Sequence, residues 1–295
     1  MIYNIFSRNA YKKVVASIIF VSGIFSTILS ANEANVKSAS EFMNALYKQD
    51  RAVLTRLFGD TYTQHNQHYK DGKEALLAAL QYFDGKVKIH RIFADGEFVV
   101  VHNEFSEGRG TEKVEGVGFD IFRFHNGKIV EHWDNLATKL PPNPSGRKQT
   151  DGTTKIDTKA DSKASKKIVE SFVKDVLMGQ NPDKLASYFD NGKYIQHNAS
   201  IADGLSGLGQ ALESMAKNGL VMKYHKIHKI LGSGDFVLSI SEGEFGKADS
   251  KGNAPKVAFY DLFRVKNGKI AEHWDIIEPI LSEDKAQNRN TKFGF

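Results

Sequence analysis

Residues 119–134 read FDIFRFHNGKIVEHWD, and residues 260–275 read YDLFRVKNGKIAEHWD, with 11 of the 16 positions identical. In each stretch an Asn-Gly pair separates two runs in which apolar and polar residues alternate. Asn-Gly supplies the two positive-φ positions that a two-residue type I′ turn requires, so each stretch predicts a β-hairpin. Two nearly identical hairpins indicate a domain that occurs twice in the chain.

The register of each hairpin follows from its turn. Counting back from the two turn residues places Asp120 opposite Trp133, and Asp261 opposite Trp274 in the second copy. Directly opposite residues share one face of a sheet. We therefore expect both aspartates among aromatic side chains on an inner face, where lost hydration raises the carboxyl pKa towards the range useful for proton transfer. The alternative is that each Asp is a sheet residue bonded to a helix N-terminus or to water.

Two histidines are further catalytic candidates, because each lies in a Tyr-x-Gln-His-Asn motif. Alternation along the second motif places His197 on the same strand face as Ile195, which predicts an inward imidazole able to relay a proton. The alternative is a core histidine bonded to the backbone. The predicted catalytic residues are thus Asp120, Asp261, His65 and His197, and the predicted pocket residues are Trp133, Trp274, Phe122, Phe263, His90, His228 and His102.

The two copies differ at one of these positions. His102 has no counterpart, because the second copy places Ile240 there. A pocket lined by His102 would make the first copy the more polar one, which favours it as the catalyst. The straight register also places His132 and His273 on the opposite sheet face, where we expect them at a contact between the domains.

Metal and cofactor sites are not indicated. The pairs His65 with His68 and His225 with His228 have i,i+3 spacing, which on a strand puts the two rings on opposite faces, and neither pair has an adjacent acidic ligand. The chain has no cysteine, which excludes thiolate ligands and thiol chemistry. No glycine-rich loop able to cradle a phosphate is present. We therefore expect no metal and no cofactor.

The beginning of the chain has the layout of a secretory signal peptide, predicted at residues 1–31. Arg8, Lys12 and Lys13 precede an apolar run over 14–29 that ends in small residues. The run is shorter than the ~20 residues that span a bilayer comfortably, so we expect a cleaved signal rather than an anchor, with no stable membrane span remaining. The predicted location is the periplasm or the cell exterior.

Charge argues against a nucleic-acid partner. The formal net charge of +5 falls to +2 when the three basic residues of the leader are removed. No dense stripe of Lys and Arg remains along the rest of the chain, and such a stripe is what phosphate backbones require.

The remaining sequence predicts an α+β protein with two domains, in agreement with ~150 residues per domain in a chain of 295. Helical spacing and a capping box at 38–41 predict that helices open the first copy; a third helix at 73–82 and strands at 87–93 and 97–105 lead into the hairpin. The same order recurs in the second copy. The predicted boundaries are domain 1 at 36–140, a polar linker at 141–160, domain 2 at 161–282 and a flexible tail at 283–295.

The motif YxQHN, followed by an Asp-Gly turn and by FRxxNGKIxEHWD, resembles the SnoaL-like branch of the nuclear-transport-factor-2-like superfamily. The resemblance covers about residues 36–138 and 165–280. It implies two tandem cone-shaped domains, each with three helices on a curved, mostly antiparallel sheet around an internal pocket. Relatives include polyketide cyclases, dehydratases and isomerases of small lipophilic molecules, and many members that only bind. In the SnoaL-like cyclases an acidic residue on this strand is the general acid/base, and Asp120 and Asp261 match it.

Two kinds of function follow from these expectations. One is an exported, cofactor-independent isomerase, cyclase or lyase that uses an Asp general acid/base on a small lipophilic carbonyl compound. The alternative is a non-catalytic protein that binds a small ligand, or a protein-interaction module. In either case we expect the two copies to pair through their outer sheet faces as an internal pseudo-dimer.

Overall fold

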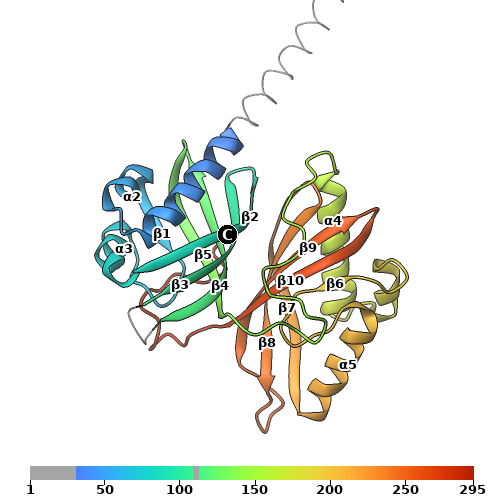
Figure 1. The fold of residues 1–295 in the computed structure, drawn as a ribbon. Helices are drawn as coiled ribbons and strands as arrows, with labels where there is room; N and C mark the ends of the chain where they lie inside the picture. The colour runs from blue at the N-terminus through green and yellow to red at the C-terminus, as the bar shows by residue number, and fades with distance from the viewer. Residues whose placement is uncertain (1–30, 109–112) are drawn as a thin grey trace, which may run out of the picture.

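The structure, a computed structural model, describes residues 31–108 and 113–295, so the predicted signal peptide lies almost wholly outside the described residues. The chain forms two five-stranded sheets, with helices preceding the strands of each (Figure 1). The strand orders are β1-β5-β4-β3-β2 and β6-β10-β9-β8-β7. Within the described ranges, no helix is both long and apolar enough to cross a membrane.

The first domain opens with a helix over residues 31–47, so the predicted helix start at Ser38 is wrong. Asp50 begins the next helix by accepting a hydrogen bond from the backbone N–H of Val53. The elements that follow are α2 (Arg51–Leu57), β1 (Phe58–Gln64), α3 (Lys73–Ala79), η1 (Leu80–Tyr82), β2 (Gly85–Asp95), β3 (Phe98–Glu107), β4 (Val114–His125) and β5 (Lys128–Thr138).

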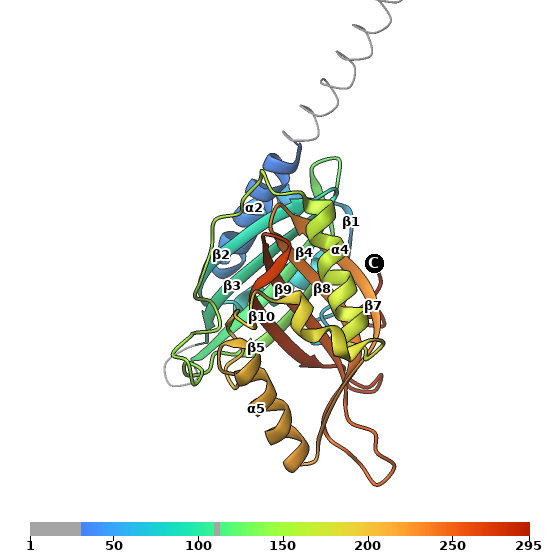
Figure 2. The same cartoon turned by 90° about the vertical axis from the view of Figure 1, so that its right-hand side faces the viewer.

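The second domain repeats this order. Asp161 caps its first helix through the backbone N–H groups of Lys163 and Ala164. Its elements are α4 (Ser162–Phe172), η3 (Val173–Leu177), η4 (Pro182–Tyr188), β6 (Ile195–Gln196), α5 (Gly204–Lys217), β7 (Leu220–Ser233), β8 (Phe236–Lys247), β9 (Lys256–Lys266) and β10 (Lys269–Pro279). In Figure 2, α4 and α5 lie in front of the second sheet and the first sheet lies behind it. The tandem α+β architecture predicted from the repeat is confirmed.

Each hairpin turns at the predicted residues and contains one irregularity that the sequence did not reveal. Asn126 and Gly127 have φ of 49° and 72°, as a type I′ turn requires. Phe124 pairs with Ile129, but Arg123 pairs with Glu131, so Val130 is an extra residue on its strand. Such a β-bulge exchanges the two faces of every later residue on that strand.

The bulge overturns the predicted pairing of Asp120 with Trp133. Asp120 pairs with Asp134, and Trp133 pairs with Ile121 on the opposite face. In the second hairpin Ala271 is the extra residue, and Asp261 accordingly pairs with Asp275 instead of Trp274.

The outer faces of the two sheets meet in one buried hydrophobic cluster that includes Trp133 and Trp274. At its edge the fully buried Asn135 donates hydrogen bonds to the carbonyl oxygens of Ala258 and Ile276, at 2.9 and 2.8 Å. The inner faces of the sheets instead pack against the helices of their own domains, in two separate clusters.

Each domain is also covered by a segment that follows the other domain. The C-terminal segment (residues 283–295), predicted to be loosely ordered, returns to the first domain, where Phe295 stacks on Trp133 and the Thr291 carbonyl lies 2.5 Å from His65 Nδ1 (Figure 1). The interdomain segment (residues 141–160) covers the second domain in the same way. There the Lys148 carbonyl lies 2.8 Å from His197 Nδ1.

Candidate functional site

The inner face of the first sheet carries a cluster of two carboxylates and an imidazole. Asp120 on β4 and Asp134 on β5 are cross-strand neighbours, and His132 shares their face because of the bulge. His132 Nε2 lies 2.9 Å from Asp120 Oδ1. Asn103 donates to the other oxygen of Asp120 at 2.6 Å, and Asn66 donates to Asp134 Oδ2 at 2.7 Å.

The proton on His132 can be assigned from its second partner. Gln64 Oε1 accepts a hydrogen bond from the backbone N–H of Asn66, which can only donate, so this atom is the amide oxygen. It lies 3.0 Å from His132 Nδ1, which therefore carries a hydrogen. The short contact between His132 Nε2 and Asp120 then requires one further proton, shared by the imidazole and the carboxyl group.

The second domain repeats this arrangement. Gln196 Oε1 accepts from two backbone N–H groups and lies 3.1 Å from His273 Nδ1, while His273 Nε2 lies 3.1 Å from Asp261 Oδ1. Asn198 donates to both oxygens of Asp275, at 3.0 and 2.8 Å. A tyrosine, Tyr224, donates to Asp261 where the first copy uses Asn103. Each copy is thus an Asp-His-Asp cluster held by a Gln and an Asn.

Electrostatics favour a bound proton in the second cluster. Burial raises the pKa of the Asp275 carboxyl, and the charge of Asp261 adds to this rise, although His273 opposes it. Burial alone would lower the pKa of His273, but the hydrogen bond to Asp261 and the charges of Asp275 and Asp261 outweigh burial and raise it. Two carboxylates this close cannot both stay ionised without a positive partner, which the protonated imidazole supplies.

The first cluster faces a small cavity of about 40 Å³. At ~10–15 Å³ per water, this space holds about three water molecules. Asp134 Oδ1 and Asn103 Oδ1 are buried at its wall without a hydrogen-bond partner among the described residues. Burial and the charges of Asp134 and Asp120 raise the pKa of Tyr62, another wall residue, so its phenol remains a hydrogen-bond donor.

The second cluster adjoins a much larger space. Asp275 and Asn198 lie at the side of a groove of about 350 Å³ between α5, β7, β8 and the end of β10. Most other side chains along this groove are apolar, including Met215, Met222 and Phe245. The volume is within the usual range for small-molecule sites, ~300–1,000 Å³.

Among the predicted site residues, four lie on the inner faces. Asp120 and Asp261 occupy the clusters, as the hairpin chemistry predicted, although their neighbours differ from the expected ones. Phe122 stacks on His132 with ring centroids 4.9 Å apart, and Phe263 stacks on His273 at 4.6 Å. These phenylalanines form the apolar floor beneath each imidazole.

The predicted inward position of His65 and His197 is wrong. His65 stacks on Trp133 at 4.5 Å, on the outer face, and its Nε2 lies 2.8 Å from Glu131, which also binds Arg123. His197 repeats these contacts with Trp274, Glu272 and Arg264. Both tryptophans therefore belong to the contact between the domains and not to a pocket.

The remaining predicted pocket residues also lie outside the clusters. His102 accepts a hydrogen bond from the buried Arg91 and stacks on Phe119 at the domain contact. His90 lies beside Glu104 on β2, and His228 bonds Glu242 and stacks on Phe293 of the C-terminal segment. His102 thus gives no reason to favour the first copy as the catalyst.

The residues that sequence reasoning missed are His132, His273, Asp134 and Asp275. The straight register assigned them to the outer face, and His132 and His273 to a domain contact; the bulge reverses both. One available signal was charge, since only a bulged register places Arg123 opposite Glu131. By geometry each Asp-His-Asp cluster could also hold a metal ion, because one ligand atom from each residue lies within 4.8 Å of the others.

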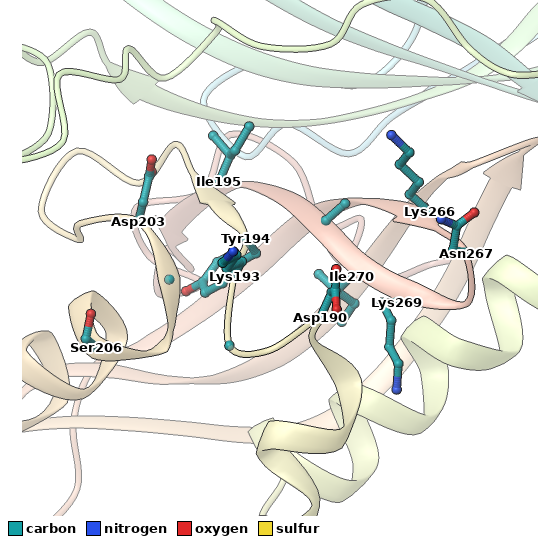
Figure 3. A pocket seen from close by; sticks show the side chains of 13 residues that line it. Asp190, Lys193, Tyr194, Ile195, Asp203, Ser206, Lys266, Asn267, Lys269 and Ile270 are labelled. Atoms are coloured by element: carbon teal, nitrogen blue, oxygen red, sulfur yellow. The ribbon is translucent and has the colours of Figure 1, made fainter.

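A wide surface groove of about 860 Å³ lies away from both clusters, between the loop before β6, the start of α5 and the hairpin of β9 and β10 (Figure 3). It carries Lys193, Lys266 and Lys269 together with Asp190 and Asp203. In Figure 3, Lys266 and Lys269 extend in opposite directions, and Lys269 donates to the Ser187 carbonyl. The basic groups therefore do not converge on one point.

Three comparisons with solved structures give fold neighbours of low identity. An LEH-like epoxide hydrolase of M. tuberculosis is 23% identical, with 36% of this chain and 84% of that chain covered and a TM-score of 0.33. A putative polyketide cyclase of Bacillus cereus ATCC 10987 is 19% identical, with 35% and 74% covered and a TM-score of 0.33. Bal32a, from a soil-derived mobile gene cassette, is 18% identical, with 36% and 91% covered and a TM-score of 0.33.

A comparison with curated proteins gave no match. Family models, in contrast, match both halves of the chain. The model described as SnoaL-like domain matches residues 39–132, and the model described as SnoaL-like polyketide cyclase matches residues 167–281. Each match includes the helices, the Tyr-x-Gln-His-Asn motif and strands of one sheet. The chain therefore belongs to the SnoaL-like family and consists of two SnoaL-like domains in tandem.

Proposed function

We propose that the protein is an acid–base catalyst of the isomerase, cyclase or lyase kind that acts on a small lipophilic carbonyl compound through an Asp-His-Asp cluster. The observation that carries the proposal is the assigned proton. His273 Nδ1–H is held by Gln196, so Nε2 and Asp261 share a proton directly beside the carboxyl group of Asp275.

The roles within the cluster follow from this arrangement. Asp275, or Asp134 in the first copy, takes a proton from a carbon next to the carbonyl group, and the electron pair moves onto the carbonyl oxygen. The raised pKa of Asp275 makes its carboxylate a stronger base than an exposed one. The adjacent imidazolium stabilises the negative charge that develops, and the protonated carboxyl group returns the proton at another atom of the substrate.

A second candidate function applies to the first domain. Its cavity of about 40 Å³ is too small for an organic substrate, which favours a structural or non-catalytic role for this copy. Export to the periplasm or the cell exterior is part of the proposal and rests on the leader pattern of the sequence alone.

Exchange of carbon-bound protons tests the proposed chemistry without knowledge of the natural substrate. We expect the full chain to accelerate deuterium incorporation from D₂O into 2-tetralone or a 5-ene-3-ketosteroid, measured by mass spectrometry. Asp275→Asn keeps the shape of the side chain and removes the base, so the rate above buffer should fall by about 10²–10⁴-fold.

Asp134→Asn is the matched variant, and it assigns the reacting copy. An exchange rate that survives in the double variant would contradict a role for the Asp-His-Asp clusters. A wild-type chain that binds these ketones without exchanging their protons would support the non-catalytic alternative instead.

A further inference from the structure

The aromatic residues that close the first domain are absent from the second. In the first domain Tyr69 stacks on Phe83 with ring centroids 5.5 Å apart, and Tyr47 contacts both Phe83 and Phe105. All four line the small cavity beside Asp134. Together they fill the space between the helices and the sheet.

Smaller residues occupy two of these positions in the second domain. Ile201 has the place of Tyr69, at the same offset as the Tyr-x-Gln-His-Asn motif. Gly243 has the place of Phe105, since Phe105 pairs with Gly116 and Gly243 with the equivalent Val257. The space beside Asp275 is accordingly a groove of about 350 Å³ instead of a closed cavity.

The wall of this groove is not made by the second domain alone. Ala137 at the end of β5 and Leu140 and Gln149 on the interdomain segment line it as well. Leu140 is 48% exposed, which is unusual for a large apolar side chain, and the backbone N–H of Leu140 donates to Gln149 Oε1 at 2.7 Å. The first domain and the segment that follows it therefore complete the site of the second.

We propose that this groove binds the substrate, and that it takes an elongated, uncharged, mostly apolar molecule whose one polar group, a carbonyl or hydroxyl, lies against Asp275. The location and the substrate class rest on the proposed function, but the groove itself does not. Its apolar length excludes a densely charged ligand, because a charged group there would lose hydration without a partner. Met215 and Met222 adapt to ligands of varied shape, so the site tolerates different apolar skeletons.

Prodan, a small fluorescent naphthyl ketone whose emission shifts to the blue in an apolar site, is a suitable probe. We expect saturable binding to the full chain. Ala211→Trp fills the groove from α5 and should weaken binding about tenfold or more, since a wider side chain overlaps the ligand. The matched control is Gln210→Trp, an exposed neighbour on the same helix, which should bind as the wild type does.

Leu140→Ala tests the contribution of the interdomain segment. It removes part of the apolar wall without disturbing either domain core, so the dissociation constant for Prodan should rise about fivefold. Equal binding by wild type, Ala211→Trp and Leu140→Ala would overturn the proposal, as would the absence of saturable binding to a folded wild type. A groove that serves self-association would give a dimer in sedimentation velocity without Prodan binding, which also overturns it.

The two proposals fail in different ways. Prodan is not turned over in this assay, so loss of binding in Ala211→Trp and Leu140→Ala supports the groove even if Asp275→Asn leaves proton exchange unchanged. Proton exchange that depends on Asp275 in a chain that does not bind Prodan would support the chemistry and reject the groove.

Discussion

At the scale of single residues, one amide side chain decides what each imidazole can do. Gln64 and Gln196 each present a carbonyl oxygen whose orientation is fixed by backbone N–H donors, and this oxygen holds the Nδ1–H of the neighbouring histidine. The reactive nitrogen, Nε2, is then left for the carboxyl group. A free histidine would exchange between two tautomers, and only one of them suits this cluster.

The pKa of His273 gives a test at this scale. We expect Asp261→Asn to lower the pKa of His273, because the carboxylate that stabilises the imidazolium is removed while burial, which opposes the charge, remains. Nitrogen-15 NMR of the imidazole over pH measures this directly. An unchanged His273 titration in Asp261→Asn would show that the two groups do not share a proton.

The same pair gives stability a defined pH dependence. A raised pKa means that folded His273 binds its proton more tightly than the unfolded chain, whose ordinary value is 6.5. This contribution to the free energy of unfolding is therefore present in full below about pH 6.5 and is lost as pH rises through the pKa of the folded state. The difference in stability between wild type and Asp261→Asn should shrink over the same range, as seen by denaturant unfolding.

At the scale of elements, the site depends on a single extra residue per hairpin. The repeat, the turn and the inner position of Asp120 and Asp261 follow from the sequence, because alternation and Asn-Gly turns are local signals. The bulge at Val130 and Ala271 does not, since nothing in the apolar pattern of that strand requires it. It is stabilised by tertiary partners: Arg123 and Arg264 reach Glu131 and Glu272 only in the bulged register.

Deleting Ala271 tests whether the bulge places the cluster. The deletion would turn His273 and Asp275 outward and Trp274 inward, so we expect loss of cooperative folding or destabilisation beyond about 4 kcal/mol, measured by thermal and denaturant unfolding. The control, Ala271→Gly, keeps the residue count and should cost about 1 kcal/mol. Similar effects of the two changes would mean that the register is set elsewhere.

At the scale of the whole molecule, each domain is finished by residues that belong to the other side of the chain. The C-terminal segment places Phe295 on Trp133, and its buried Lys292 donates to Glu278 at 2.6 Å and to the Asp134 carbonyl at 3.2 Å. Asn288 holds the carbonyl oxygens of Asn66 and Tyr69. Composition alone predicted a loose tail, because the partners of these polar residues lie more than 200 positions away.

Truncation after residue 282 tests the role of the C-terminal segment. Phe293 and Phe295 lose their contacts, so we expect a fall of about 3 kcal/mol in the free energy of unfolding. In a Trp274→Phe background, the emission of Trp133 should shift to the red because Phe295 no longer covers it. In a Trp133→Phe background, Trp274 should be unaffected, and a shift there would contradict the division between the two segments.

The crossed position of these segments has a consequence for how the protein is made. Synthesis runs from the N-terminus, and domains begin to fold while later residues are still being added. The interdomain segment that covers His197 and Trp274 is translated before the second domain exists, so that domain can fold directly onto it. The segment that covers His65 and Trp133 is translated only after the whole second domain, so the first domain must wait with its outer face open until the second is complete.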